Sequence, residues 1–395
     1  MKKTFLILLS LFSICSSCKS QNKKENRVII NNNKSIEIYS DGIGKEIKQI
    51  IDRNAKETLK DSLINSLSIG LHINNVSFCF NYGELTKGKG DIPAHNTIYE
   101  IASITKTFVG SLAAKAVLEG KLSLEDDIRT YLPRPYPNLE HNGNPIKIKH
   151  LLTHTSGLPN GVLGTKNEIR LTKQNEIEYA TMHLSLEDKQ TKPKFLTELS
   201  KLKITEKPGK TFNYSNSGTN LMGYILELVY NRPFQELILS EIISKAKMND
   251  THFNVSKNKQ NRLANGYLLS KPMPKSNLAN TLWGAEGALK STTSDMLKYI
   301  HYQFTNNEIV NESHKKIFEI DTDYWIGYYW WIISNQNHDL HFRHDGGISR
   351  AKSVLAIFPK KKIGIIVFTN QSSIRVNQKL NDLTYKIYND LNDHK

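Results

Sequence analysis

Apolar and polar residues alternate along this 395-residue chain in a way that predicts helices and strands near both ends and a helical middle. Apolar positions recur at helical spacing in five segments and form short runs between turn residues in five others. The expected helices are Gly44–Leu63, 103–117, Gly218–Tyr230, Pro233–Lys247 and Ile374–Leu391. The expected strands are Ser68–Ile73, Val76–Tyr82, Leu340–His344, Ala351–Phe358 and Ile363–Thr369. This order predicts an α/β fold in which strands from both chain ends build one sheet around a helical insertion.

The first residues predict an exported protein. A lysine-rich start precedes an apolar stretch, residues 4–14, which is too short to span a bilayer and is typical of a secretory signal. Two serines stand directly before Cys18, as in a bacterial lipoprotein signal, although Cys15 occupies a position where that signal usually has leucine. We expect a signal peptide over 1–17, lipidation of Cys18, a polar tether over 18–42, and anchoring to the bacterial cell envelope, at the outer membrane or facing the periplasm. An ordinary signal peptide cut nearby is the alternative.

The composition excludes several functional classes. The formal net charge of +15 suggests a nucleic-acid partner, but the basic residues are scattered along the chain. No zinc-finger spacing, basic helix or aromatic RNA-binding motif accompanies them, so a solvated lysine-rich surface explains the charge. No internal apolar run is long enough for a transmembrane bundle. We expect no nucleic-acid partner, and the sequence does not define an oligomeric state.

Cysteine and histidine positions predict no metal or cofactor site. Cys79 lies in an apolar strand pattern, where a free cysteine is often part of the core. His338, His341 and His344 are spaced three residues apart, and on a strand that spacing sends neighbours to opposite faces. We therefore expect neither a metal nor a cofactor.

Ser103 and Lys106 form the first of three candidate catalytic motifs. On a helix, residues three apart share a face, so the serine hydroxyl and the lysine amine can meet. A buried lysine can lose its proton and act as a base. The spacing alone is uninformative, because seven other serines are also followed by lysine three residues on. Context distinguishes Ser103, since it opens the most apolar helix of the mature chain, where a lysine without partners is costly.

Two polar turns supply the other motifs. Tyr214-Ser215-Asn216 leads into a helix, and its phenol can relay protons while its amide can both donate and accept hydrogen bonds. His344-Asp345-Gly346-Gly347 ends a strand; its glycines allow close approach of a substrate, and its histidine places a donor or a titratable charge at the rim of a cleft. Each motif alone is also compatible with an ordinary turn.

In this order and in these contexts, the motifs Ser-x-x-Lys, Tyr-x-Asn and His-x-Gly resemble those of the serine penicillin-recognising hydrolases, above all the class C β-lactamases and serine DD-peptidases. Residues 122–133, 151–159 and 287–295 also look like the family, and the resemblance covers roughly residues 45–390.

The resemblance implies a β-lactamase-like α/β fold, with an antiparallel sheet flanked by N- and C-terminal helices and a mostly helical inserted lobe. The hydrolase domain would then be residues 43–395. Its α/β lobe would combine residues 43–102 and 283–395, and its helical lobe would be residues 103–282.

The resemblance also implies an acyl-enzyme mechanism with Ser103 as the nucleophile. Lys106 and Tyr214 would share the general-base and general-acid work, and Asn216 would orient Lys106 and the substrate amide. The N–H groups of Ser103 and Gly347 would form the oxyanion hole. The histidine of the 151–159 stretch, His154, is expected to hold its loop together rather than to perform chemistry.

The third motif departs from the family in a way that bears on the substrate. His344 stands before Asp345 and Gly346 where typical β-lactamases have the lysine of Lys-Thr-Gly, so a permanent cation is replaced by a side chain that is mostly neutral at pH 7. Arg350 could restore a positive charge. We expect a serine hydrolase acting on amides or esters, most of all on peptides containing D-amino acids, as DD-peptidases do. The alternatives are an esterase, a weak class C-type β-lactamase, and a catalytically inactive ligand-binding or sensor domain on the same fold.

Overall fold

The computed structural model describes residues 28–30, 42–162, 175–334 and 339–393. The predicted signal peptide, Cys18, most of the predicted tether and His338 lie outside these ranges. Within the described ranges, no helix is both long and apolar enough to cross a membrane. The same ranges hold no group of three or more His, Cys, Asp or Glu side chains arranged to bind a metal.

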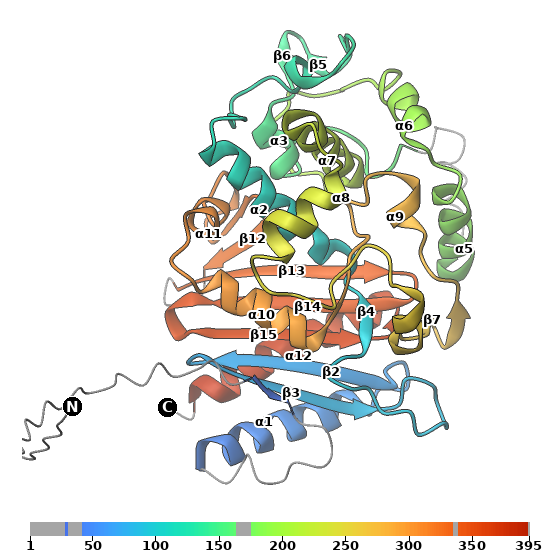
Figure 1. Ribbon diagram of the computed structural model, residues 1–395, viewed down its shortest axis with the longest axis vertical. Helices are drawn as coiled ribbons and strands as arrows, with labels where there is room; N and C mark the ends of the chain where they lie inside the picture. The colour runs from blue at the N-terminus through green and yellow to red at the C-terminus, as the bar shows by residue number, and fades with distance from the viewer. Residues whose placement is uncertain (1–27, 31–41, 163–174, 335–338, 394–395) are drawn as a thin grey trace, which may run out of the picture.

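A nine-stranded sheet forms the centre of the fold (Figure 1). Its order is β1-β3-β2-β15-β14-β13-β12-β11-β10, and strands from the two chain ends meet where β2 pairs with β15. The strands are β1 Val28–Ile30, β2 Ser66–Ile73, β3 Val76–Gly83, β10 Phe318–Asp321, β11 Tyr324–Gly327, β12 Trp330–Ser334, β13 Leu340–Ile348, β14 Ala351–Phe358 and β15 Ile363–Thr369. The predicted α/β class is confirmed, with one difference: β1, within the stretch expected to be a tether, pairs with β3 in parallel, whereas the other pairs are antiparallel.

The strands that the sequence predicts pair through tight turns. Asn74 and Asn75 both adopt positive φ, at 49° and 65°, which is the conformation that a two-residue hairpin turn between twisted strands requires. Strands β10 to β12 were not predicted. Their aromatic residues stand among polar ones and many of their side chains are only partly buried. These strands therefore lack the apolar runs that identify β14 and β15.

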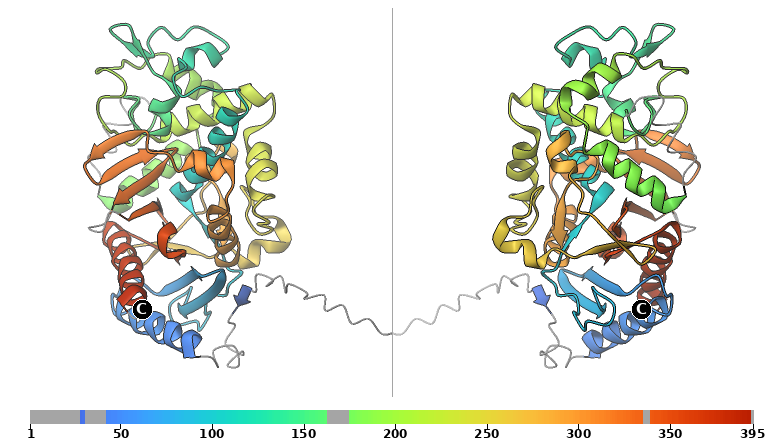
Figure 2. Two further views of the ribbon diagram at one scale, coloured as in Figure 1. Left: turned by 90° about the vertical axis from the view of Figure 1, so that its left-hand side faces the viewer. Right: turned by 90° about the vertical axis from the view of Figure 1, so that its right-hand side faces the viewer.

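Helices cover both faces of the sheet. α1 (Gly42–Thr58) and α12 (Ile374–Asp393) lie side by side on one face, as Figure 2 shows, and bury an apolar cluster with β2, β14 and β15. α10 (Thr293–Gln303) packs on the other face against β2 and β15. Both chain ends therefore contribute a helix and strands to a single layered unit.

The inserted segment is mainly helical and surrounds α2 (Thr105–Leu118). Its other helices are α3 (Ile148–Leu152), α5 (Glu176–Glu187), α6 (Lys192–Leu199), α7 (Asn216–Tyr230), α8 (Phe234–Leu237) and α9 (Leu278–Thr281); α11 (Glu308–Ser313) follows α10. α2 is buried nearly all round, and Gly110 is required in it because a Cβ there would lie 2.0 Å from the Tyr328 carbonyl oxygen. The predicted helix Pro233–Lys247 is interrupted, since α8 passes into a π-helical turn, Ile238–Ile243.

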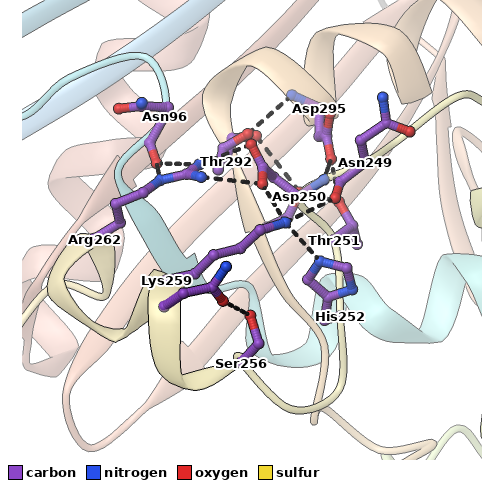
Figure 3. A network of polar contacts seen from close by, with 12 residues as sticks. Asn96, Asn249, Asp250, Thr251, His252, Ser256, Lys259, Arg262, Thr292 and Asp295 are labelled. Atoms are coloured by element: carbon purple, nitrogen blue, oxygen red, sulfur yellow. Dashed lines mark hydrogen bonds and ion pairs between the residues drawn. The ribbon is translucent and has the colours of Figure 1, made fainter.

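A polar network fastens the loop after the π-helical turn to the start of α10 (Figure 3). The Asp295 carboxylate accepts hydrogen bonds from the Asp250 N–H at 2.6 Å and the Thr251 hydroxyl at 3.0 Å. Asp250 in turn forms ion pairs with Arg262 at 2.7 Å and Lys259 at 2.8 Å. The end of the family-like stretch 287–295 thus positions the chain around the site and does not enter it.

Candidate active site

Ser103 lies in a 3-10 turn, Ala102–Ile104, that leads directly into α2. Ala102 has φ of +48°, a left-handed conformation that costs a non-glycine residue energy. Strand β4 (Ile98–Glu100) ends just before this turn, and the Ile101 N–H donates to the Leu289 carbonyl at 3.1 Å. The serine therefore sits at a strained, well-anchored corner rather than in the first regular turn of a helix.

Lys106 is the residue that distinguishes this corner from an ordinary helix start. Its side chain is fully buried, and Nζ donates to Ser103 Oγ at 3.1 Å, to Asn216 Oδ1 at 2.7 Å and to the Glu286 carbonyl at 2.5 Å. Burial lowers the pKa of Lys106 to about 7, while the negative charge of Glu286 acts in the opposite direction. These three donated bonds belong to the ammonium form. In the neutral form the two N–H groups stay on the Asn216 and Glu286 oxygens, which can only accept, and the lone pair faces the Ser103 hydroxyl and can take its proton near neutral pH.

Tyr214 joins the same group from the loop before α7. Its ring lies 5.0 Å from Lys106 Nζ, and its phenol is hydrogen-bonded to the Ser103 side chain. Burial raises the pKa of Tyr214 well above its ordinary value, although the Ser103 hydrogen bond lowers it. The phenol thus keeps its proton at neutral pH and can donate it, which suits a proton donor better than a base.

His154 fixes the Tyr214 loop. Its ring stacks at a tilt on the Tyr214 ring with centroids 4.3 Å apart, and its Nδ1 accepts the Ser215 N–H at 3.2 Å. Its backbone carbonyl accepts the Asn213 N–H at 2.7 Å. These contacts all position the second motif, in line with the structural role expected for His154.

His344 lies in β13 and is buried, but its charge and hydrogen-bonding groups differ from those of the lysine that typical β-lactamases have at this position. Nδ1 lies 2.7 Å from the Asp345 carbonyl oxygen, and because a carbonyl only accepts, Nδ1 carries the proton of the neutral ring. Nε2 is then an acceptor, and it is buried without a hydrogen-bond partner among the described residues. Burial, and next the charge of Lys106, lower the pKa of His344 to about 4. His344 therefore brings no positive charge to the cleft that it lines, and its free lone pair is buried.

Gly346 and Gly347 serve different purposes. A Cβ on Gly346 would lie 2.1 Å from Ser353 Oγ and 2.2 Å from the Ile101 carbonyl oxygen, so only glycine lets β13 approach the nucleophile turn. Gly347 is exposed and lies opposite Lys352 in the β13–β14 hairpin. Gly347 also lines the same cavities as Ser103.

The cleft consists of two adjoining cavities of about 390 and 590 Å³. Both are lined by Ser103, Gly347, Lys352 and Ile374. The smaller cavity also contacts Tyr214 and His344, and the larger one extends to α5. The structure thus brings together Ser103, Lys106, Tyr214, Asn216, His344, Gly346 and Gly347 around one open cleft.

Arg350 is not part of this group. Its side chain is 3% exposed, and its guanidinium forms an ion pair with Glu100 at 3.1 Å and donates to the Ala264 carbonyl at 2.8 Å. It therefore ties the β13–β14 turn to β4, the strand that leads to Ser103, and lines neither cavity. The expectation that Arg350 brings a charge to the cleft is wrong, because the buried Glu100 already neutralises it.

Replacing Arg350 by alanine is expected to destabilise the fold. The substitution leaves Glu100 buried without its partner, which is expected to lower the free energy of unfolding by about 3–5 kcal/mol. Denaturant unfolding measures the loss. Lys201→Ala, which breaks an exposed pair with Glu198, serves as a control with an expected change within about 0.5 kcal/mol. Equal stability of the Arg350 and Lys201 variants would contradict the structural role.

Two residues of the site were missed from the sequence. Glu286 contacts Lys106 through its backbone, and its carboxylate accepts the Asn220 amide at 2.9 Å, an arrangement that only the tertiary fold creates. Lys352 could have been found: a two-residue turn at 349–350 places it opposite Gly347.

The fold and the Ser103, Lys106 and Tyr214 set support a serine hydrolase. The chain belongs to the Beta-lactamase family, whose model matches residues 51–387. It is 28% identical over 352 residues to "Protein flp" of Staphylococcus aureus (strain N315), covering 87% of this chain and 67% of that protein. It is 24% identical to a "Beta-lactamase" of Providencia stuartii, covering 82% of this chain and 87% of that protein.

Solved structures share the fold. A β-lactamase/D-alanine carboxypeptidase from Yersinia pestis, complexed with citrate, superimposes with a TM-score of 0.72 at 21% identity, covering 87% of this chain and 98% of that one. A mutant of a class C β-lactamase superimposes with a TM-score of 0.71 at 21% identity, covering 87% of this chain and 97% of that one. The recognition of the family from its three motifs is confirmed.

Proposed function

We propose that the protein hydrolyses amide or ester substrates through an acyl-enzyme on Ser103, and that its substrates are most of all peptides containing D-amino acids. The observation that carries this proposal is the contact between Ser103 Oγ and the fully buried Lys106 Nζ, at 3.1 Å, on the floor of an open cleft. A lysine whose pKa is near 7 is a base matched to neutral pH.

In the first step, Ser103 Oγ attacks the substrate carbonyl carbon and its proton passes to Lys106 Nζ. The N–H groups of Ser103 and Gly347 stabilise the oxyanion. As the bond to the leaving group breaks, Tyr214 donates its phenol proton to the leaving nitrogen or oxygen and regains one from Lys106. A water molecule then attacks the acyl carbon and gives a proton to Lys106; as the bond to Ser103 Oγ breaks, that proton passes to Oγ, which releases the acid product and restores the Ser103 hydroxyl and neutral Lys106.

The pH profile is expected to follow from Lys106. Because only neutral Lys106 accepts the serine proton, kcat/KM should rise with pH and level off above a midpoint near 7. His344 and His154 do not titrate there, since burial lowers the pKa of His344 to about 4 and that of His154 well below its ordinary value.

Glu286→Gln provides a second test of the assignment of this midpoint to Lys106. The Glu286 charge raises the pKa of Lys106, so its removal is expected to move the midpoint to lower pH. A profile that is flat between pH 6 and 8 in the wild-type protein would contradict the role of Lys106.

A second candidate function is an esterase, or a weak class C-type β-lactamase. His344 favours it, because at this position of the third motif a neutral ring stands where typical β-lactamases have a cation. Similar proteins include both a β-lactamase and a β-lactamase/D-alanine carboxypeptidase, which supports either activity. An inactive binding domain is less well supported, since such a domain has no need of a buried lysine beside a serine.

The experiment is a substrate panel applied to the wild-type protein and to Ser103→Ala. It comprises a D-Ala-D-Ala peptide, a p-nitrophenyl ester, a chromogenic cephalosporin and a fluorescent penicillin. We expect the peptide or the ester to be turned over fastest, β-lactams to be turned over slowly, and every activity to require Ser103. Identical behaviour of the two proteins on every probe would refute the proposal.

For location, we propose an exported protein held at the cell envelope through a lipid on Cys18. The residues before Cys18 support it. Metabolic labelling with a palmitate analogue tests it: label should be present in the wild-type protein and lost in Cys18→Ala.

A further inference from the structure

Lys352 projects from β14 beside the nucleophile. In the β13–β14 hairpin it lies directly opposite Gly347, and its Nζ would be only 2.6 Å from a Cβ at that glycine. Its side chain therefore lies across Gly347, whose N–H we assign to the oxyanion hole. Lys352 also lines both cavities that open from Ser103.

The other cationic side chains near the cleft are already neutralised or uncharged. Arg343 holds Asp345 through two hydrogen bonds, at 2.8 and 2.6 Å. Arg350 is buried against Glu100, and burial lowers the pKa of His344 to about 4, so its ring is neutral. Among the described residues that line the cavities, Lys352 is thus the cation that has neither a hydrogen bond nor an ion pair.

Two carboxylates lie near Lys352, but neither satisfies it. Asp345 is taken by Arg343 and also accepts the Asn381 amide at 3.0 Å. Glu176, at the start of α5, is exposed to solvent, so water screens its charge. Burial lowers the pKa of Lys352, and the charges of Glu176 and Asp345 raise it by less. This balance is typical of an ammonium group that is largely desolvated and has no anion close to it. Such a group gains most from an anionic ligand.

We propose that Lys352 binds the free carboxylate of the substrate, so that the enzyme prefers peptides or esters whose leaving part ends in a carboxylate. The inference rests on the proposed function of Ser103. It places the cation on β14, opposite Gly347, and so supplies a positive charge that the third motif lacks.

The dimensions of a peptide agree with this assignment. In a peptide cleaved at its last bond, the terminal carboxylate lies one residue from the scissile carbonyl, about 3.8 Å along the chain. A cation that holds it must therefore line the same cavity as Ser103 and Gly347, as Lys352 does. An oxyanion at the Gly347 N–H and a carboxylate at Lys352 Nζ can then be bound together.

The test compares two substrates that differ only at the terminus, an N-acyl-D-Ala-D-Ala peptide and its C-terminal carboxamide. The measured quantity is the ratio of kcat/KM for acid over amide. We expect the wild-type ratio to be about tenfold or more in favour of the acid, and Lys352→Gln to bring it close to one. Lys352→Arg keeps the charge and should retain most of the preference. Glu176→Gln should increase the preference, because a competing anion is removed.

Lys360→Gln is the matched control. It removes the same charge just beyond the opposite end of β14, where Lys360 pairs with Asp339 on the surface, and should leave the ratio at the wild-type value. Melting temperatures of all variants show that they fold. A wild-type protein without preference for the acid, or an unchanged ratio in Lys352→Gln, would overturn the assignment.

A binding measurement separates this inference from the proposed function. N-acetyl-D-alanine and N-acetyl-D-alaninamide are titrated into Ser103→Ala with and without Lys352→Gln. Tighter binding of the acid that disappears with Lys352→Gln supports the carboxylate site even if no substrate is hydrolysed. Equal binding of acid and amide contradicts it even if Ser103 is acylated.

Discussion

Ser103→Ala is expected to abolish turnover, with kcat lowered on the order of 10⁴- to 10⁶-fold. Ser103 Oγ is the atom that would form the covalent bond, and no other serine in the described part of the chain donates to or accepts from a buried lysine in a cleft. Steady-state kinetics on the fastest substrate of the panel measures the loss. Substrate binding should persist, because the cleft and its cation remain.

Ser200→Ala is the matched control for that result. Ser200 begins the same Ser-x-x-Lys spacing, but it is exposed at the end of α6, and its hydroxyl donates to the Thr197 carbonyl at 2.8 Å. Its replacement should leave kcat at the wild-type value. Activity retained in Ser103→Ala, or lost equally in both variants, would contradict the assignment of the nucleophile.

Lys106→Arg is expected to lower kcat about 10²- to 10⁴-fold although it keeps the positive charge. Arginine stays protonated at any accessible pH, so it cannot accept the serine proton. Its larger head group also has to replace three short contacts, to Ser103, Asn216 and the Glu286 carbonyl. Single-turnover acylation rates measure the effect on the chemical step.

The control lies on the same helix. Lys115 is two to three turns further along α2 and pairs with Glu119 and Glu241 away from the cleft, so Lys115→Arg should react at the wild-type rate. If Lys106→Arg acylated as fast as Lys115→Arg, a different group would have to remove the serine proton.

Much of the fold could be predicted because local patterns and packing agree. The paired asparagines 74 and 75 set a hairpin, and the apolar runs within β14 and β15 match strand segments buried on both faces. The aromatic strands β10 to β12 could not be predicted in the same way, since they are held by successive pairing, β12 with β13, β11 with β12 and β10 with β11, rather than marked by an apolar pattern of their own.

The candidate site could be predicted in part, for a related reason. Ser103, Lys106 and Tyr214 are named by motif and context, and the structure brings them together. The cation of the cleft could not be predicted, because it depends on what each charged side chain contacts in the folded structure. Arg350 meets the buried Glu100, while Lys352 lies across Gly347 in the cleft, and a sequence does not show either contact.

The most direct measurement is to quench the enzyme in the steady state with an N-acyl-D-alanyl ester and to map the adduct by mass spectrometry of peptides. The account predicts one acyl group on the peptide that contains Ser103. This adduct should be transient in the wild-type protein and absent in Ser103→Ala. It should accumulate in a Lys106 variant in which deacylation is slowed more than acylation. Turnover without any adduct on that peptide, or an acyl group that remains in Ser103→Ala, would contradict it.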